Sequence, residues 1–361
     1  MKLLVVSDYR NTQSVRPEAE WMIGLKKEDI DVRIITYPGS EYAIQFSDYN
    51  IPVETTHPTQ KWDPTFIKYL RQRIQKERID FVLLFNSSAI TNGIKAARNT
   101  SVKVLLYRGY AGHISWYDPA AYLKFLHPRV DKIICVSQAV VADLSSRTFI
   151  RQDKLITIHK GHHSDWYDHV APSNLSHFSI PDDAFVLACM ANVRKFKGIP
   201  YLLKALPEIS DLENLHVLMI GHGMESSALS KLRENSRMKE RVHLTGFRDD
   251  VLSLLSACDL FILPSTHGEG LSKSLLEAML LALPVIATDI PANREVLGDQ
   301  ISADILVPPK NSQALAIAVR NMYSNPERRK SWGKQLRLYA MGAFHIDRTI
   351  SETVSLLKRL S

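Results

Sequence analysis

The sequence has few of the features that mark secreted or disulfide-bonded proteins. It contains only three cysteines, and each lies inside an apolar run without the spacing of a disulfide or a metal site: Cys135, Cys189 and Cys258. We expect them to be small hydrophobic residues of the core. The start, MKLLVVSDY, has only residues 3–6 as an uninterrupted apolar stretch, well short of the roughly 7–15 residues of a signal peptide. A cytoplasmic protein is expected.

The sequence also lacks the common motifs for metals and for nicotinamide cofactors. No Asp-x-Asp pair follows a predicted strand, and His162 and His163 are adjacent without a third ligand nearby. The glycine fingerprint G-x-G-x-x-G is absent after the first strand, and GHGME after Ile220 does not complete one. We therefore expect no metal cofactor, and a dehydrogenase is disfavoured.

Composition and charge are those of an ordinary globular protein with anionic partners. Of the 361 residues, 45% are hydrophobic and 23% charged, enough for two domains with separate cores. The formal net charge is +7, which favours phosphorylated donors, acidic glycans, an anionic membrane surface or nucleic acid. Only the charge supports nucleic-acid binding, so we do not expect nucleic acid as a partner.

Buried strands and amphipathic helices alternate along the chain, which predicts parallel sheets covered on both faces. The expected strands are 3–6, 32–36, 81–85, 102–107, 133–136, 155–158, 185–190, 217–220, 242–245, 260–263, 285–287 and 304–307. A loop-like segment at 171–179 separates two series, so we predict two α/β domains, 1–172 and 173–345. A helix in 346–361 should pack back on the first domain. Ligands are expected in a cleft between them, beyond the carboxyl ends of the strands.

Two helices carry further expectations. The first is predicted to begin with Pro17 in its first turn, after a polar loop through Ser14. A basic amphipathic helix at 66–78 is typical of either an anionic membrane contact or a solvated face, and the second is favoured.

The most informative segment is GEGLSKSLLEAMLLALPVIATDI, in which a loop carrying Glu269 leads into a helix carrying Glu277. If the helix begins near Ser272, its free amides point back toward Glu269 and favour a phosphate or a sugar hydroxyl. Glu277 is placed to accept hydrogen bonds from a vicinal diol such as a ribose. The alternative is a capped helix with two surface carboxylates.

This segment, read with its neighbours, resembles glycosyltransferase family four, the retaining GT-B enzymes with two doubly wound Rossmann-like domains. VHLTGFRDDVLSLLSACDLFILPS precedes it, and IGHGME, KGIPYLLKAL and CVSQAVVADL also match the family in order. The resemblance covers nearly all of residues 130–300. It implies a hexosyltransferase that uses a UDP- or GDP-sugar and a glycan or lipid-linked acceptor in cell-envelope polysaccharide synthesis.

The resemblance also implies roles for residues of the second domain. Lys197, in the family's Lys-Gly pair, would neutralise the leaving diphosphate. Glu269 would hold a hydroxyl of the transferred sugar, and Glu277 the ribose. Arg194 is expected to supply the second cation, although many relatives carry that arginine further upstream, where this chain has Asn192. The remaining expected donor contacts are Gly270, Leu271, Ser272, Gly221, Phe247 and Arg248.

In the first domain, the resemblance implies that His113 of YRGYAGHISWYDP reaches the transferred sugar, with acceptor contacts from Arg108, Trp116, Tyr117 and Asp118. The backbone of the first loop, at Ser14, Val15 and Arg16, should lie near the diphosphate. The family usually has paired glycines there, and this chain has none, so the backbone can approach a ligand less freely.

The resemblance leaves the mechanism and two other functions open. No pair of carboxylates is spaced for double displacement, so we expect front-face transfer in which the leaving phosphate assists deprotonation of the acceptor. A nucleotide-sugar epimerase or hydrolase on the same fold, and a non-catalytic sugar-nucleotide or glycan binding protein, are the alternatives. The positive charge is compatible with an enzyme bound peripherally at the inner face of a membrane.

Overall fold

The computed structural model describes residues 1–10, 12–298 and 305–361, with only the backbone described at 12–14. The chain forms two compact units: Met1–His162 with Phe344–Ser361, and His163–Ala343. The first division comes earlier than the predicted boundary at 172/173 because the segment after His163 is bonded to unit 2. There the Ser256 hydroxyl donates to Val170 O at 3.3 Å, and Arg337 pairs with Asp168.

Unit 1 is built on a seven-stranded parallel sheet with the order β3-β2-β1-β4-β5-β6-β7. The strands are β1 Lys2–Val6, β2 Asp31–Ile35, β3 Val53–Glu54, β4 Phe81–Leu84, β5 Lys103–Arg108, β6 Lys132–Cys135 and β7 Leu155–Thr157. The central strands are almost wholly buried, as expected when helices cover both faces. The two-residue strand β3 is missing from the sequence prediction, since it has no apolar run.

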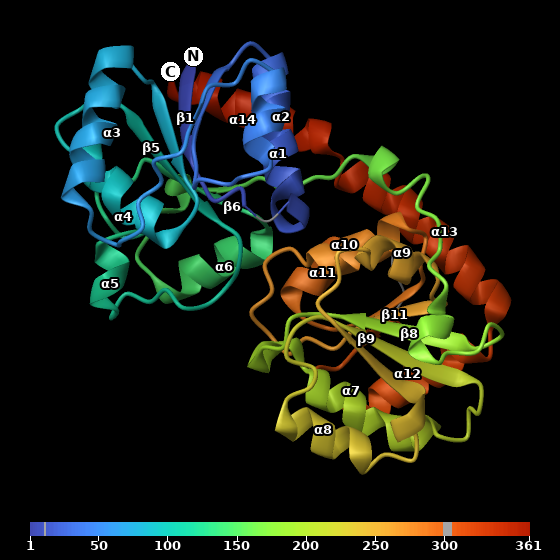
Figure 1. Cartoon of the computed structure of the whole chain (residues 1–361). Helices are drawn as coiled ribbons and strands as arrows, with labels where there is room; N and C mark the ends of the chain where they lie inside the picture. The colour runs from blue at the N-terminus through green and yellow to red at the C-terminus, as the bar shows by residue number, and fades with distance from the viewer. Residues whose placement is uncertain (11, 299–304) are drawn as a thin grey trace. The chain divides into compact units, whose positions relative to one another are not determined.

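Helices cover both faces of this sheet (Figure 1). They are α1 Thr12–Lys27, α2 Tyr42–Asp48, α3 Pro64–Glu77, α4 Ser87–Ala96, α5 Pro119–Tyr122, α6 Gln138–Arg147 and α14 Ile346–Leu360. Helix α14 packs against α1, where the Trp21 indole Nε1 donates to the Thr353 hydroxyl at 2.9 Å. Both ends of the chain therefore lie on unit 1, beside each other in Figure 1.

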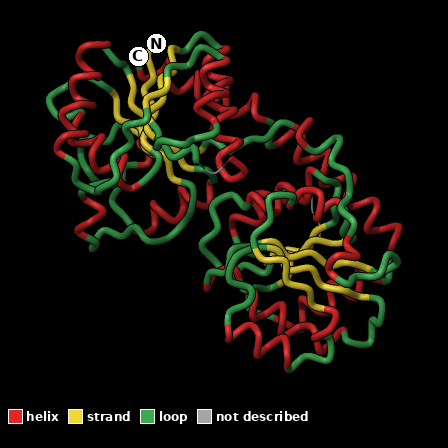
Figure 2. Tube along the Cα trace, viewed as in Figure 1, coloured by secondary structure: helices red, strands yellow, loops and turns green. Residues whose placement is uncertain are grey.

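Unit 2 repeats the plan with a six-stranded parallel sheet in the order β10-β9-β8-β11-β12-β13. The strands, yellow in Figure 2, are β8 Phe185–Met190, β9 Leu215–Ile220, β10 Val242–Gly246, β11 Leu260–Leu263, β12 Val285–Thr288 and β13 Leu306–Val307. Residue 304 of the predicted last strand lies outside the described residues. The helices are α7 Ile199–Ala205, α8 Ser227–Glu234, α9 Val251–Ser256, α10 Lys273–Leu280, α11 Pro291–Leu297, α12 Ser312–Tyr323 and α13 Pro326–Ala343.

The predicted start of the first helix is wrong. Helix α1 begins at Thr12, so Pro17 lies inside the helix and Ser14, Val15 and Arg16 lie in its first turns instead of a loop. The proline, which is typical of a first turn, was a misleading signal because the polar residues before it also adopt helical structure.

Two of the three cysteines are core residues, as expected. Cys135 and Cys189 are fully buried, and burial raises the pKa of each thiol to about 12. Cys258 is only partly buried.

The basic helix α3 uses two of its cations for contacts within unit 1. Arg71 donates to Lys95 O at 2.8 Å, and Arg73 pairs with Glu54 and Glu77. Nowhere in the described ranges is a helix both long and apolar enough to cross a bilayer.

Candidate functional site

The sheet of unit 2 has a topological switch point between its neighbouring strands β8 and β11. From β8 the chain proceeds outward through β9 and β10, and from β11 it proceeds the other way through β12 and β13. Adjacent connections that leave in opposite directions open a crevice at the carboxyl ends of the two strands, where α/β proteins bind ligands. The loops at these ends carry Lys197 and Glu269.

The two residues meet there as a buried ion pair. The Lys197 ammonium Nζ lies 2.7 Å from Glu269 Oε1, with side-chain exposures of 16% and 7%. The Ser265 hydroxyl donates to the same carboxylate oxygen. Because both charges are largely removed from water, each depends on the other for compensation. Residues 72 positions apart in sequence thus form one polar centre.

A glycine turn fixes the position of Lys197. Gly198 has φ +67°, and a Cβ added there would lie 1.8 Å from Pro264 O, so neither the backbone conformation nor the available space admits a side chain. The Thr266 amide donates to Phe196 O at 2.6 Å. The Lys-Gly segment is therefore clamped onto the loop that leads to Glu269.

Buried hydrogen bonds of Thr288 and Asn293 hold the loop that carries Glu269. The Thr288 hydroxyl, at the end of β12, donates to Ser265 O. Asn293 of α11, fully buried, donates through Nδ2 to Thr288 O at 2.8 Å. These bonds join the carboxyl ends of β11 and β12, so the carboxylate is held by rigid elements.

Glu277 and the start of α10 lie next along the chain. Ser272 occupies the N-cap, as expected, but its side chain makes no capping hydrogen bond. The first amides of α10 are thus not capped by this side chain, and the positive end of the helix faces the Gly270–Leu271 side of the loop. Glu277 is 4% exposed and pairs with Lys273 one turn earlier.

The remaining predicted donor residues lie on loops of the same unit. Arg194 is exposed and opens the short 3-10 helix Lys195–Lys197. Gly221 directly follows β9, with φ +129° and a Cβ site 2.3 Å from Ala191 O. After β10, Phe247 is 45% exposed and stacks on His222 with ring centroids 4.9 Å apart. Arg248 pairs with Asp250 at 2.7 Å.

His113 of unit 1 lies in a constrained loop after β5. It is exposed and has φ +62°, an uncommon value for a residue with a side chain. The loop is held by the Gly112 amide, which donates to Asp143 Oδ2 at 2.6 Å, and by buried Arg108, which donates to Gly112 O. Such backbone outliers are concentrated at functional sites.

The other predicted acceptor contacts divide into two groups. Trp116 and Tyr117 expose 52% and 70% of their surface. Asp118 caps α5, its Oδ1 accepting from the Ala120 amide at 2.9 Å, which gives that carboxylate a structural role. Ser14, Val15 and Arg16 contribute the first turns of α1.

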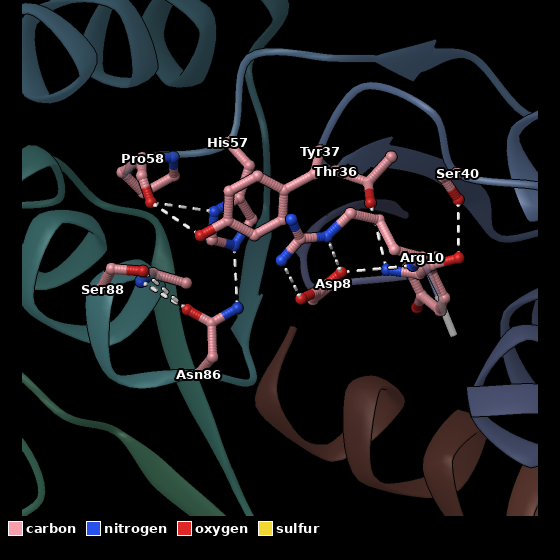
Figure 3. Close-up of polar contacts among 11 residues, drawn as sticks. Asp8, Arg10, Thr36, Tyr37, Ser40, His57, Pro58, Asn86 and Ser88 are labelled. Carbon is pink, nitrogen blue, oxygen red and sulfur yellow. Dashed lines mark hydrogen bonds and ion pairs between the residues drawn. The ribbon is translucent and has the colours of Figure 1, made fainter. Parts of the chain in front are cut away.

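The sequence prediction missed a second polar cluster, at the switch point of unit 1. Here β1 and β4 are neighbours, and the residues that follow β1, β2, β3 and β4 converge: Asp8, Arg10, Tyr37, His57 and Asn86 (Figure 3). No motif marks these residues, since they come from four separate loops. Their convergence was predictable only from the strand order.

Two protein-family models match the chain in tandem. The model described as Glycosyltransferase Family 4 matches residues 19–166, and Glycosyl transferases group 1 matches 173–338. The chain belongs to glycosyltransferase family four. The second match contains Lys197, Glu269 and Glu277.

A curated relative of this family-four chain is the O-antigen biosynthesis glycosyltransferase WclY of Escherichia coli. The two are 30% identical over 145 residues, which is 40% of each chain. The match thus spans well under half the length of that relative.

Solved structures share the fold over the whole chain. The glycosyltransferase of Rickettsia africae has a TM-score of 0.83 at 18% identity and covers 99% of this chain and 98% of its own. HepE of Anabaena, solved in complex with UDP and glucose, has a TM-score of 0.79 at 17% identity, with coverage of 99% and 100%. The predicted fold of two Rossmann-like domains is confirmed.

Proposed function

We propose that this chain is a retaining glycosyltransferase that moves a hexose-type sugar from a UDP- or GDP-sugar, bound by unit 2 without a metal, to a glycan or lipid-linked acceptor. The observation that carries the proposal is the buried Lys197–Glu269 pair at the switch point, beside the start of α10. The pair provides a cation that can bind a diphosphate and a carboxylate that can bind a sugar hydroxyl. The two groups lie at hydrogen-bonding distance from each other.

The pair suits a donor that brings both chemistries. Before donor binding, Lys197 and Glu269 compensate each other. A bound donor replaces each partner with its own group: diphosphate oxygens accept from Lys197, and a sugar hydroxyl donates to Glu269. As the bond between the anomeric carbon and phosphate breaks, negative charge grows on the phosphate beside the ammonium, which stabilises that charge where it develops. The amides at the start of α10 add partial positive charge, and Glu277 accepts from the ribose.

The proposed transfer occurs on one face of the sugar. The acceptor hydroxyl attacks the anomeric carbon from the side the diphosphate leaves, and its proton passes to a phosphate oxygen. The new bond therefore has the configuration of the old one. Product with inverted configuration, measured by proton NMR, would exclude this mechanism.

The acceptor class is proposed from the relatives and from charge. The name of WclY refers to O-antigen biosynthesis, which supports a role in cell-envelope polysaccharide synthesis. A formal net charge of +7 supports peripheral attachment at the cytoplasmic face of an anionic membrane, where lipid-linked acceptors are found.

Calorimetric titration of the full chain with UDP, GDP, ADP and NAD, with and without magnesium, tests the donor site. We expect one nucleoside diphosphate to bind selectively without magnesium, and Lys197→Ala to weaken it. Lys204→Ala, on the exposed side of α7, is the matched control. If no diphosphate binds, or only NAD does, the proposal fails. Nucleotide release that is independent of an acceptor glycan would favour the hydrolase.

A further inference from the structure

The polar cluster at the switch point of unit 1 has no role in donor binding as proposed above. It consists of Asp8, Arg10, Tyr37, His57 and Asn86, from the loops that follow β1 to β4 (Figure 3). Its place, beyond the carboxyl ends of neighbouring strands at a reversal of strand order, corresponds to that of the Lys197–Glu269 pair in unit 2.

Arg10 is held flat by a three-layer stack. Its guanidinium carbon lies 3.9 Å from the Tyr37 ring centroid, and the imidazole of His57 stacks on the other face of that ring at 4.0 Å. Both faces of Tyr37 are thereby occupied, so this ring serves as a support. The Tyr37 hydroxyl donates to Pro58 O at 3.2 Å, which anchors the stack.

The hydrogen bonds of Asn86 determine the state of His57. Asn86 caps α4, with Oδ1 accepting from the Ala89 amide at 3.0 Å, so Nδ2 faces His57 Nε2 at 2.8 Å and donates to it. His57 Nε2 must then be the acceptor, and Nδ1 carries the proton that is donated to Pro58 O at 3.0 Å. Burial lowers the pKa of His57 to about 4, which keeps the ring neutral.

Arg10 and Asp8 form the accessible edge of the cluster. Nε and one terminal nitrogen of Arg10 donate to the two oxygens of Asp8 at 2.9 and 2.8 Å, and the side chains are 52% and 39% exposed. A guanidinium has five N–H donors. Among the described residues, the terminal nitrogen that does not bond Asp8 has no hydrogen-bond acceptor, so its donors can serve a ligand. The edge therefore presents donors beside carboxylate acceptors, with no net charge.

We propose that Asp8 and Arg10 form an acceptor subsite that recognises vicinal hydroxyls of an uncharged sugar residue. A hydroxyl both donates and accepts, so two neighbouring hydroxyls can bond the carboxylate and the guanidinium together. An anionic group would gain Arg10 but approach Asp8, whose charge repels it. The inference rests on the proposed function, because that function gives the chain a sugar acceptor.

The test follows the Arg10 Nε–H signal of the nitrogen-15-labelled full chain by NMR. The probes are methyl glycosides of glucose, galactose, mannose and N-acetylglucosamine, with glucuronic acid and inorganic phosphate for comparison. We expect at least one neutral glycoside to shift this signal in the wild type. Calorimetric titration, which does not depend on that signal, should show about tenfold weaker binding of the same glycoside to Arg10→Gln, the loss expected for one charged hydrogen bond. Asp8→Asn should weaken the same glycoside.

Arg151 provides the matched control. It pairs with Asp153 by the same two-nitrogen arrangement at 2.9 and 3.2 Å, also in unit 1 and also exposed. Arg151→Gln should leave glycoside binding unchanged. The inference is overturned if no neutral glycoside binds, if Arg10→Gln binds as wild type, or if only glucuronic acid or phosphate shifts the Arg10 signal.

Titration of the same variants with UDP and GDP separates this inference from the proposed function. Nucleotide binding by both wild type and Arg10→Gln, without any glycoside effect, would reject the acceptor subsite alone. Absence of nucleotide binding by wild type would reject the donor proposal, whatever the glycosides do.

Discussion

The switch points of the two units carry ion pairs that are built in opposite ways. In unit 2, Lys197 and Glu269 are buried, and backbone geometry at Gly198 sets their positions. In unit 1, Asp8 and Arg10 are about half exposed, and side-chain stacking on Tyr37 sets their positions. The same location on the same type of sheet thus supports a rigid centre in one unit and a surface-accessible edge in the other.

The two ion pairs differ in how well they tolerate substitution. Removing either partner of a buried pair lowers the stability of the protein strongly, because the other charge remains uncompensated. An exposed pair contributes little to stability, so its residues can be replaced without unfolding the unit. We therefore expect the proposed donor site of unit 2 to tolerate substitution less well than the proposed acceptor subsite of unit 1.

Removing the buried cation should have the largest effect. Lys197→Ala leaves Glu269 buried without its partner, so we expect the free energy of unfolding to fall by about 3–5 kcal/mol. Transferase turnover should fall by at least about 100-fold. Denaturant unfolding and turnover assays, with Lys204→Ala as control, measure both effects. Equal behaviour of the two variants would show that the pair is unimportant.

The glycine turn should come next. Gly198→Ala combines a left-handed backbone with a clash against Pro264 O, whereas Gly39→Ala has a similar φ of +74° with nothing within 4 Å. The left-handed conformation alone costs about 1 kcal/mol. We expect Gly198→Ala to destabilise the protein by about 2 kcal/mol more than Gly39→Ala in urea unfolding. A smaller difference would mean that the Lys-Gly segment moves away easily.

Substitutions of Glu269 and Glu277 should separate catalysis from nucleotide binding. Glu277→Gln removes the charged acceptor proposed for the ribose, so nucleotide affinity should fall about tenfold by calorimetry. Glu269→Gln should lower turnover with little change in nucleotide affinity, since its proposed partner is the transferred sugar. Glu234→Gln, on the surface of α8, is the control. Unchanged affinity in Glu277→Gln would refute the ribose assignment.

The smallest effect is a pH dependence from unit 1. The His57 pKa is about 4 in the folded chain and about 6.5 when exposed, so between these values the unfolded state binds a proton that the folded state does not. Stability is therefore complete above pH 6.5 and falls toward pH 4, by at most about 1 kcal/mol on going from pH 6.5 to 5.5. His57→Gln should reduce this slope in thermal unfolding. An equal slope would show that His57 titrates normally.

The sequence singled out Lys197 and Glu269 of unit 2 because they lie in contiguous motifs, and the structure brings these two side chains together. The Glu269 loop, the start of α10 and the Lys-Gly pair each had a recognisable pattern. The motifs did not predict the Lys197–Glu269 ion pair. This pair forms only because β8 and β11 are neighbours in the folded sheet. Strand order is a property of the whole sheet, and local patterns do not encode it.

In unit 1 the prediction was weaker for the same physical reason. His57 follows β3, a strand too short for an apolar run, and it lies 29 positions from Asn86. An isolated histidine or arginine in a loop carries no local signal. The start of α1 was also misjudged because Pro17 resembles a first-turn residue, although the helix already runs through it.

The pairing of α1 with α14 has a consequence for synthesis of the chain. The Trp21 indole can form its hydrogen bond only after Thr353, 332 positions later in the sequence, has been synthesised. As the ribosome makes the protein, the whole of unit 2 emerges before unit 1 receives its last helix. Unit 2 is one continuous segment that can complete its fold while still tethered, whereas unit 1 carries an uncovered face until α14 has been made. We therefore expect an expressed fragment of residues 163–343 to fold more stably than one of residues 1–162.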